Sequence, residues 1–374
     1  MGEPLKKHFD ARVPRAIAKQ ISEVWPEFPT TRFLADVLRD YDDLELMDRG
    51  RSIGRALRRH LPDDFPTAID ILMRSIDVPR PNAGTGGMAS FYYLPHTSFV
   101  AESGIDHFDE SMRAQYKLTQ LFTAEFSVRP FIERHEQKSL GLLRRWANDP
   151  NHHVRRLVSE GTRPRLPWGS RLRRFQENPA PVIKLLELLK DDPEIYVRRS
   201  VANNLNDIGK DHPDVLLGVA RRWMKGASSE RQTLVRHALR SLIKQGNPEA
   251  LALLGFGGAP KVSTENVVID PKRVTKGAKV VIGFNLLSRA QRSQKLLVDL
   301  RVYFVKANGK PSPKVFKLKS VELQSGETAT FRKTITLAEL TTRKHHPGRH
   351  EVEALINGIV FALGSFRVVD SVLR

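Results

Sequence analysis

The chain of 374 residues contains no cysteine, which excludes disulfide bonds, thiolate catalysis and zinc sites with cysteine ligands. Long apolar runs are also missing, because no stretch approaches the roughly 20 apolar residues that a membrane-spanning helix needs. The first residues form no apolar signal core, and Lys6 stands where a myristoylation signal needs Ser or Thr. We therefore expect a protein of the cytoplasm that has no membrane partner.

The sequence also lacks the residues of a phosphate-binding loop and of a metal site. The glycine-rich run Gly84–Gly87 is not followed by the Lys-Ser/Thr pair of a phosphate-binding loop, so we interpret residues 80–105 as an irregular connector. The histidine pairs His152-His153 and His345-His346 have no carboxylate or cysteine at metal-ligand spacing. We expect no metal ion and no cofactor.

Acidic residues are few compared with basic ones: 42 against 61, for a net charge of +19. The excess is uneven along the chain. Residues 1–137 carry a net charge of −3, residues 138–258 carry +10, and residues 259–374 carry +12. A near-neutral segment followed by two basic ones predicts a polyanionic partner, with nucleic acid as the leading candidate. An acidic membrane surface is disfavoured, because no basic amphipathic helix with bulky apolar anchors is present.

One pattern occurs twice in the middle of the chain. Asp-Pro, three intervening residues and Val-Arg-Arg span Asp149–Arg156, and the same pattern returns 43 residues later at Asp192–Arg199. This offset is typical of two-helix repeats of the HEAT and armadillo type. Each copy predicts a helix, an Asp-Pro turn and a second helix, and such pairs stack into a solenoid with a concave binding surface.

The second helix of the later repeat shows two faces. An apolar stripe and a polar set, each with a spacing of four, are offset from one another by two residues. The stripe is Val197, Val201 and Leu205, and the polar set on the opposite face is Arg199, Asn203 and Asp207. We therefore expect a surface that presents a cation, an amide and a carboxylate.

The chain changes period after Gly255–Gly258. Before it we predict helices, among them Val13–Trp25, Thr31–Tyr41 and Met47–Leu61, a helix that opens near Pro66 behind Asp63-Asp64, and further helices from about Glu110 to Leu254. After it the period is two, typical of a small immunoglobulin-like β-sandwich. The predicted strands are Val267–Ile269, Lys279–Leu287, Leu296–Lys306, Lys314–Leu323, Thr328–Leu337, Arg349–Ile356 and Val360–Val368. The fold class is thus mainly α, with a HEAT-like solenoid in residues 1–258 and the sandwich in residues 262–374.

Four ordered motifs make the chain resemble the AlkC-type bacterial DNA alkylation-repair glycosylases. These motifs are Phe122–Phe131, Asp149–Gly161, Arg163–Gly169 and Tyr196–Asp207. The resemblance extends over nearly the whole chain. It implies a monofunctional DNA-3-methyladenine glycosylase of base excision repair, which hydrolyses the N-glycosidic bond of cationic N3-alkylated bases in duplex DNA. It also implies that the lesion is not flipped into a pocket and that an abasic site remains.

The same resemblance implies roles for individual residues. The catalytic set would be Glu125, Asp207, Glu160 and Trp168, with the carboxylates near the developing sugar cation and the indole against the lesion nucleotide. The DNA-binding set would be Arg155, Arg156, Arg163, Arg165, Arg198, Arg199, Lys310 and Lys314. The partner would be alkylated double-stranded DNA, bound by a monomer without an obligate protein partner, in a bacterial cytoplasm and associated with the nucleoid.

Each assignment has a structural alternative. Glu125 could compensate a helix dipole, Asp207 could pair with Arg199 or Lys210, and Glu160 could pair with Arg156. Trp168 could pack over a repeat, and the arginines could form an ordinary solvated face. For the whole chain the alternatives are a non-catalytic HEAT-repeat scaffold or an RNA-binding solenoid. The sandwich could contact DNA, dock a protein or only stabilise the fold.

Overall fold

The computed structural model describes residues 5–79, 89–339 and 344–370, and these form two compact units. The helical unit comprises the described residues up to His212 together with Ser228–Ala238. The second unit comprises Pro213–Ala227 and the described residues from Leu239 onward. The last helix ends at Leu253 and the first strand begins at Val262, so the predicted change of secondary structure is confirmed. Three helices that precede the first strand belong to the second unit. The boundary between the units therefore differs from the point where helices give way to strands.

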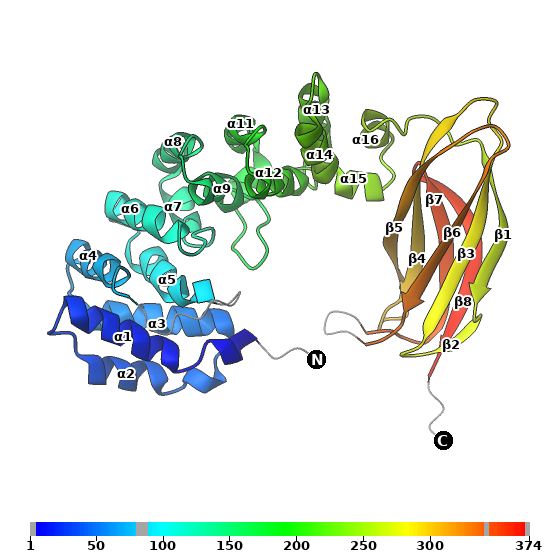
Figure 1. The fold of residues 1–374 in the computed structure, drawn as a ribbon. Helices are drawn as coiled ribbons and strands as arrows, with labels where there is room; N and C mark the ends of the chain where they lie inside the picture. The colour runs from blue at the N-terminus through cyan, green and yellow to red at the C-terminus, as the bar shows by residue number, and fades with distance from the viewer. Residues whose placement is uncertain (1–4, 80–88, 340–343, 371–374) are drawn as a thin grey trace. The chain divides into compact units, whose positions relative to one another are not determined.

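The helical unit consists of short helices that stack in pairs (Figure 1). Contacts between α1 and α4, α3 and α5, and α9 and α12 connect successive layers. The helices are α1 (Arg12–Val24), α2 (Thr30–Leu38), α3 (Leu46–His60), α4 (Phe65–Ser75), α5 (Leu94–Ser103), α6 (Phe108–Thr119), α7 (Arg129–Arg134), α8 (Glu136–Trp146), α9 (His152–Gly161), α10 (Arg173–Glu177), α11 (Ala180–Leu189), α12 (Ile195–Ile208) and α14 (Ser229–Ala238), with 3-10 turns η1 (Leu5–His8), η2 (Tyr41–Asp43) and η3 (Ala89–Tyr93).

The predicted repeat is confirmed. Helices α8 and α9 are joined by the turn at Asp149-Pro150, and α11 and α12 by the turn at Asp192-Pro193. The apolar stripes of α9 and α12 are fully buried, as the packing of α9 against α12 requires. Cap residues account for several helix starts. Asp64 accepts the backbone N–H of Thr67 at the start of α4, and Asn151 accepts that of His153 at the start of α9.

The prediction of an irregular connector over residues 80–105 is wrong for its second half. Residues 80–88, with the glycine run, lie outside the described residues, but Leu94–Ser103 forms α5. This helix packs against α3 and buries Leu94, Phe99 and Val100 together with the polar His96 and Thr97. It therefore shows no solvent-facing polar stripe. Pro95 falls in its first turn, where a missing N–H costs nothing.

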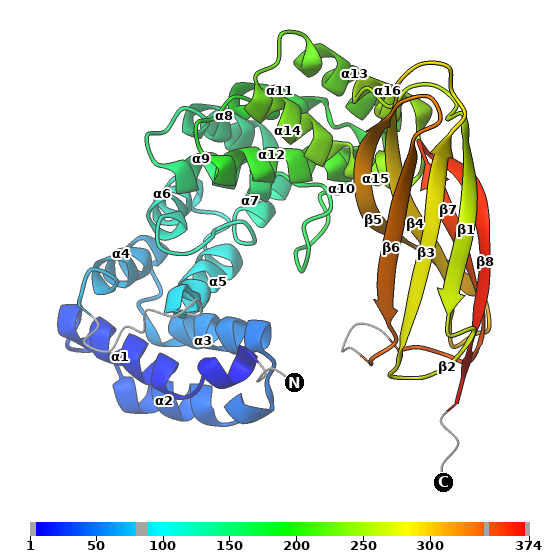
Figure 2. The ribbon, with the colours of Figure 1, turned by 45° about the vertical axis from the view of Figure 1, so that its right-hand side comes forward.

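The second unit contains an antiparallel three-stranded sheet and a mixed five-stranded sheet that lie face to face (Figure 2). The strand orders are β1-β3-β6 and β2-β8-β7-β4-β5. Its elements are α13 (Pro213–Met224), α15 (Arg240–Lys244), α16 (Pro248–Leu253), β1 (Val262–Asp270), β2 (Arg273–Thr275), β3 (Lys279–Ser288), β4 (Gln294–Val305), β5 (Pro311–Leu323), β6 (Thr328–Thr336), β7 (Gly348–Ile356) and β8 (Ile359–Val369). All seven predicted strands are present. The three-residue β2, which pairs in parallel with β8, was not predicted.

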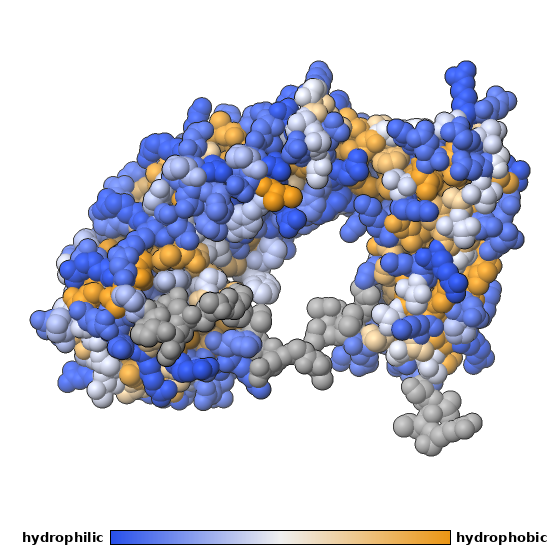
Figure 3. Space-filling view, in the orientation of Figure 1, coloured by the Kyte–Doolittle hydropathy of each residue, from blue (hydrophilic) through white to orange (hydrophobic). Residues whose placement is uncertain are grey.

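Alternating residues of the two sheets fill the sandwich core. Ile282, Phe284, Val302, Phe331 and Val352 belong to this buried cluster, and Phe284 stacks on Phe331 across neighbouring strands. Their spacing of two is the pattern expected for strands with one buried face. The surface of the helical unit in Figure 3 is mostly hydrophilic, with small hydrophobic patches. Among the described residues, no helix has the length and apolar character to cross a membrane.

Candidate functional site

The helical unit contains a groove of about 560 Å³ that collects most of the residues predicted for catalysis. Its walls come from η3, the segment Thr119–Phe126, α9, the loop between α9 and α10, and the start of α12. Glu125, Glu160 and Trp168 line it. Asp207 does not, although it lies behind one of the walls.

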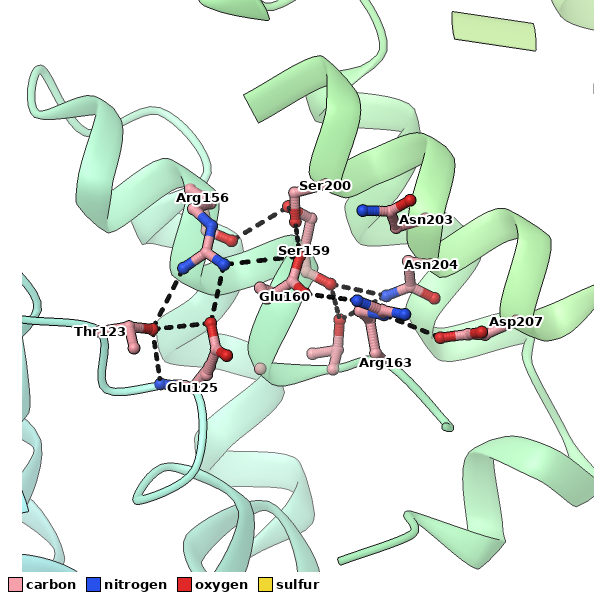
Figure 4. A network of polar contacts seen from close by, with 12 residues as sticks. Thr123, Glu125, Arg156, Ser159, Glu160, Arg163, Ser200, Asn203, Asn204 and Asp207 are labelled. Carbon is pink, nitrogen blue, oxygen red and sulfur yellow. Dashed lines mark hydrogen bonds and ion pairs between the residues drawn. The ribbon is translucent and has the colours of Figure 1, made fainter. Parts of the chain in front are cut away.

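Glu125 is held in the groove by two neighbours (Figure 4). Its Oε2 accepts the Thr123 hydroxyl at 2.8 Å and lies 2.8 Å from Nη2 of Arg156. Arg156 also donates to the Thr123 hydroxyl oxygen at 3.1 Å, so the three side chains form a closed triangle. The other carboxylate oxygen, Oε1, accepts no hydrogen bond from a described residue. Glu125 therefore lines the groove with one oxygen fixed and one oxygen available.

Glu160 has both oxygens occupied. Oε1 is 2.5 Å from Nη1 of Arg163, and Oε2 accepts the Ser200 hydroxyl at 2.6 Å. Arg156 is 3.8 Å from the same Oε2, so the predicted pair of Glu160 and Arg156 exists, but the shorter contact is to Arg163. Ser159 extends the network by donating to Ser200 at 2.7 Å (Figure 4).

The expected exposure of Asp207 is wrong, because only 1% of its side chain is accessible. Its Oδ2 lies 2.8 Å from Nε of Arg163, and its Oδ1 lies 2.7 Å from Nζ of Lys210. The physical reason is that the chain after α9 folds over this face of α12 and brings in Arg163. The Lys210 pair that the sequence left open is present.

Arg163 is the centre of this buried cluster, since it bridges Glu160 and Asp207 (Figure 4). Burial works to lower its pKa, but the two carboxylates outweigh this and raise it. The pKa of Arg156 behaves in the same way: burial lowers it, but the charges of Glu125 and Glu160 outweigh this effect, so the pKa is raised overall. Both guanidinium groups therefore remain charged.

Trp168 projects from the loop Thr162–Leu172 between α9 and α10, which protrudes from the helices in Figures 1 and 2. It is 72% exposed, so it does not pack over a repeat. Its φ of 64° lies in the left-handed region, which is unusual for a bulky residue. Such backbone strain persists where the surroundings impose it, and it clusters at functional sites.

An aromatic wall of the groove was not predicted. Tyr196 is 42% exposed, and the guanidinium of Arg156 lies 4.9 Å from the centre of its ring. His153 lies 5.8 Å from the same ring, centre to centre. Burial raises the pKa of Tyr196. The pKa of His153 is lowered, mainly by burial and to a smaller extent by the charge of His152. The repeat contained a signal for this wall, because His153 and Tyr196 occupy equivalent positions 43 residues apart.

The first arginine of each Val-Arg-Arg motif is bound to its own Asp-Pro turn. Arg155 donates to the carbonyls of Asp149 and Pro150 at 2.9 and 3.0 Å. Arg198 donates to those of Asp192 and Pro193 at 2.6 and 2.8 Å. Arg155 also pairs with Asp192, 2.6 Å away, and so ties one Asp-Pro turn to the next.

The remaining predicted DNA-binding residues differ in their partners. Arg165 pairs with Asp211. Arg199 lines a second hollow of about 370 Å³ between α12 and α14 and has no partner among the described residues. In the sandwich, the Lys310 side chain has no partner among these residues, and the Lys314 ammonium lies 4.9 Å from the centre of the Phe316 ring.

This arrangement favours the binding of a positively charged group against Glu125 and an aromatic contact from Trp168 or Tyr196. A carboxylate oxygen without a protein partner can face a cation or accept a proton from water. The described part of the chain contains no group of three or more His, Asp or Glu side chains placed to hold a metal ion.

Comparisons with known proteins agree on one family. A family model described as "Uncharacterised protein YhaZ, C-terminal Ig-like domain" matches residues 263–370. The uncharacterized protein YhaZ of Bacillus subtilis (strain 168) is 36% identical over 358 residues, which cover 95% of this chain and 97% of YhaZ. The structure of the Pseudomonas fluorescens alkylpurine DNA glycosylase AlkC, bound to DNA containing an abasic site analog, is 37% identical. It matches with a TM-score of 0.91 over 98% of this chain and 100% of the AlkC chain.

Proposed function

The chain belongs to the AlkC-type alkylpurine DNA glycosylase family, and we propose that it excises cationic N3-alkylated bases, first of all 3-methyladenine, from duplex DNA. The product would be an abasic site, formed by hydrolysis without a lysine nucleophile and without flipping the base into a pocket. The observation that carries this proposal is the free Oε1 of Glu125 in a groove that also contains the exposed Trp168.

The chemistry of the substrate explains why this groove would suffice. A base alkylated at N3 already carries a positive charge, so it leaves without a strong general acid. The sugar develops positive charge as the bond breaks, and a fixed negative oxygen stabilises this charge. Glu125 supplies that oxygen and accepts the proton of the attacking water. Trp168, and Tyr196 beside Arg156, present aromatic faces to the lesion nucleotide.

In this scheme Glu160 and Asp207 do not contact the substrate and act through the arginines that they bind. Each uses both carboxylate oxygens for contacts within the protein. Their negative charges balance Arg163 and, through Glu160, part of Arg156. They thereby leave Glu125 less strongly engaged by arginine than it would be alone.

Phosphate binding falls to the basic residues that remain available. Arg199 has no partner in the described chain, and Lys310 and Lys314 extend from the sandwich. We propose that residues 1–258 act as the catalytic and DNA-binding domain and residues 262–374 as a second DNA-contacting domain. We also propose a monomer in the bacterial cytoplasm, with no protein partner or cofactor. The contributions of Arg155, Arg156, Arg163, Arg165 and Arg198 to DNA binding stay predictions, and each of these residues already has a partner within the protein.

The test measures release of free 3-methyladenine from methylated duplex DNA by the wild type and by Glu125→Gln. The variant keeps the shape of the side chain and removes its charge. We expect a loss of about a hundredfold in single-turnover rate with nearly unchanged DNA affinity, as for removal of one group that stabilises transition-state charge. The matched control is Glu110→Gln, which neutralises a carboxylate whose ion-pair partner is Arg113.

Two results would contradict the proposal. Wild-type protein that binds the duplex but frees no alkylated base would favour the non-catalytic scaffold, which needs the arginines but not the carboxylates. Equal rates for Glu125→Gln and the wild type would remove Glu125 from catalysis. Asp207→Asn and its neighbour control Asp211→Asn separate a role of Asp207 in the reaction from the general cost of disturbing an arginine pair.

A further inference from the structure

The most completely buried cation among the described residues of the helical unit does not line the groove. Arg129 begins α7 and its side chain is inaccessible to solvent. It forms no ion pair with a described carboxylate. Its guanidinium donates only to backbone carbonyls: Nη1 to Gly161 at 2.8 Å and to Arg163 at 2.9 Å, and Nε to Ser170 at 3.0 Å, with Nη2 also on Ser170.

These carbonyls lie at the two ends of the loop that carries Trp168. Gly161 ends α9, Arg163 follows it, and Ser170 lies near the far end of the loop. The last carbonyls of a helix have no partner within the helix, and a cation at that end interacts favourably with the helix dipole. Arg129 therefore caps α9 and, with the same planar group, fixes the return of the loop.

Between these anchors the loop makes a tight turn. The N–H of Gly169 donates to the carbonyl of Leu166 at 3.2 Å, and Leu166 is buried. Trp168, inside this turn, has a φ of 64° and an exposed ring. A loop that is fixed at its base and turned at its tip holds the indole in one direction, although few protein atoms touch it.

Burial of Arg129 costs free energy that a neutral side chain would not incur. Desolvation lowers its pKa to about 10, and the nearest carboxylate charges only partly offset this. The hydrogen bonds to the carbonyls must offset this cost before Arg129 adds to the stability of the fold. Its distinctive property is geometric, because the guanidinium fork reaches three carbonyls that a lysine ammonium cannot bind together.

We propose that Arg129 is a positioning residue for excision, which sets the Trp168 loop against the lesion nucleotide. The proposal rests on the glycosylase function proposed above. Arg129 touches neither the DNA nor the reacting atoms in this scheme, and it acts through Trp168 alone.

The test compares Arg129→Lys with Arg49→Lys. Arg49 is a matched control, because it is also buried and donates to the carbonyls of Leu44, Lys6, Phe9 and Asp42, away from the groove. We expect Arg129→Lys to slow single-turnover excision by about tenfold to a hundredfold, as for a misplaced catalytic contact, with little change in DNA affinity. Arg49→Lys should lower the Tm by about as much as Arg129→Lys does, but it should leave the excision rate nearly unchanged. Equal rates for the two variants would overturn the proposal.

A double-mutant cycle with Trp168→Ala tests whether Arg129 acts through the indole. If it does, Arg129→Lys adds no further loss of rate in the Trp168→Ala background. Losses that multiply would show a role of Arg129 independent of Trp168 and would refute the inference. If Arg129→Lys does not fold, Arg129→Gln, which keeps one amide donor, replaces it in both experiments.

Fluorescence provides a measurement that does not depend on enzymatic activity. The Trp168 signal is obtained by subtracting the spectrum of Trp168→Phe, which contains the other three tryptophans. Its quenching by acrylamide should change in Arg129→Lys and stay constant in Arg49→Lys. If the wild type releases no base, the proposed function fails while this measurement still reports on the clamp. Unchanged quenching in Arg129→Lys would overturn the clamp itself.

Discussion

Replacement of Arg163 by methionine should destabilise the helical unit far more than the same change at Arg165. Arg163 bridges Glu160 and Asp207 at 2.5 and 2.8 Å, and less than a tenth of each of the three side chains is exposed. Methionine fills a similar volume but leaves two buried carboxylates without their shared cation. Arg165 pairs with Asp211 at a site where about a quarter of each side chain is accessible.

The expected magnitude follows from what remains after the change. Loss of one partner from a buried ion pair costs about 3–5 kcal/mol. Here Glu160 keeps Ser200 and the more distant Arg156, and Asp207 keeps Lys210, so the lower end of about 3 kcal/mol applies. For a unit of this size this lowers the Tm by about 6–12 °C. Arg165→Met should cost about 1 kcal/mol or less, as a partly exposed pair does.

Urea unfolding followed by far-UV circular dichroism measures the difference, and the salt dependence of DNA binding completes the test. A phosphate contact at Arg163, which the sequence predicts, would instead reduce the log–log salt slope by about 0.9 and leave stability almost unchanged. An equal loss of stability in the two variants would refute the reasoning, because it would place Arg163 in the same solvated environment as Arg165.

Two further predictions concern the sandwich. The double variant Lys310→Gln/Lys314→Gln should lower the slope of log affinity against log salt concentration by about 1.8, since each lost phosphate contact lowers it by about 0.9. An unchanged slope would exclude both lysines from the interface. Burial lowers the pKa of His350 from 6.5 to about 4, so between these values the unfolded state binds more protons than the folded state. Stability from this group is complete above about pH 6.5 and is lost as the pH falls toward 4. His350→Gln should flatten the pH dependence of sandwich unfolding, and an unchanged profile would contradict this assignment.

Much of the fold could be predicted because its signals are local. The Asp-Pro turns, the cap at Asp64 and the apolar stripe of α12 each depend on residues within one or two helical turns. The strands could be predicted because seven of them are at least nine residues long, and several, such as β3 and β6, alternate between more and less buried residues. The three-residue β2 offers no such run. Helix α5 was missed because it is buried among other helices and therefore lacks a polar face.

The site could be predicted only as a set of residue types. The sequence places Arg199, Asn203 and Asp207 on one face, and it cannot show that the loop after α9 covers Asp207 with Arg163. It also cannot distinguish the two arginines of each motif. Arg155 and Arg198 point back to their own turns, whereas Arg156 reaches the groove. The contact of Arg163 with Asp207 and that of Arg156 with Thr123 join residues more than 30 positions apart, which periodicity does not record.

The three carboxylates of the site are therefore not equivalent, although their residue type and their motifs suggest equal roles. Glu160 and Asp207 have both oxygens engaged, and Glu125 has one oxygen free. A cation that enters the groove meets the free oxygen of Glu125 without breaking a contact, whereas an approach to Glu160 or Asp207 must displace an arginine, a serine or a lysine. Because of that cost, we propose that Glu125 makes the direct interaction with the developing sugar cation. It leaves Glu160 and Asp207 to fix the arginines around it.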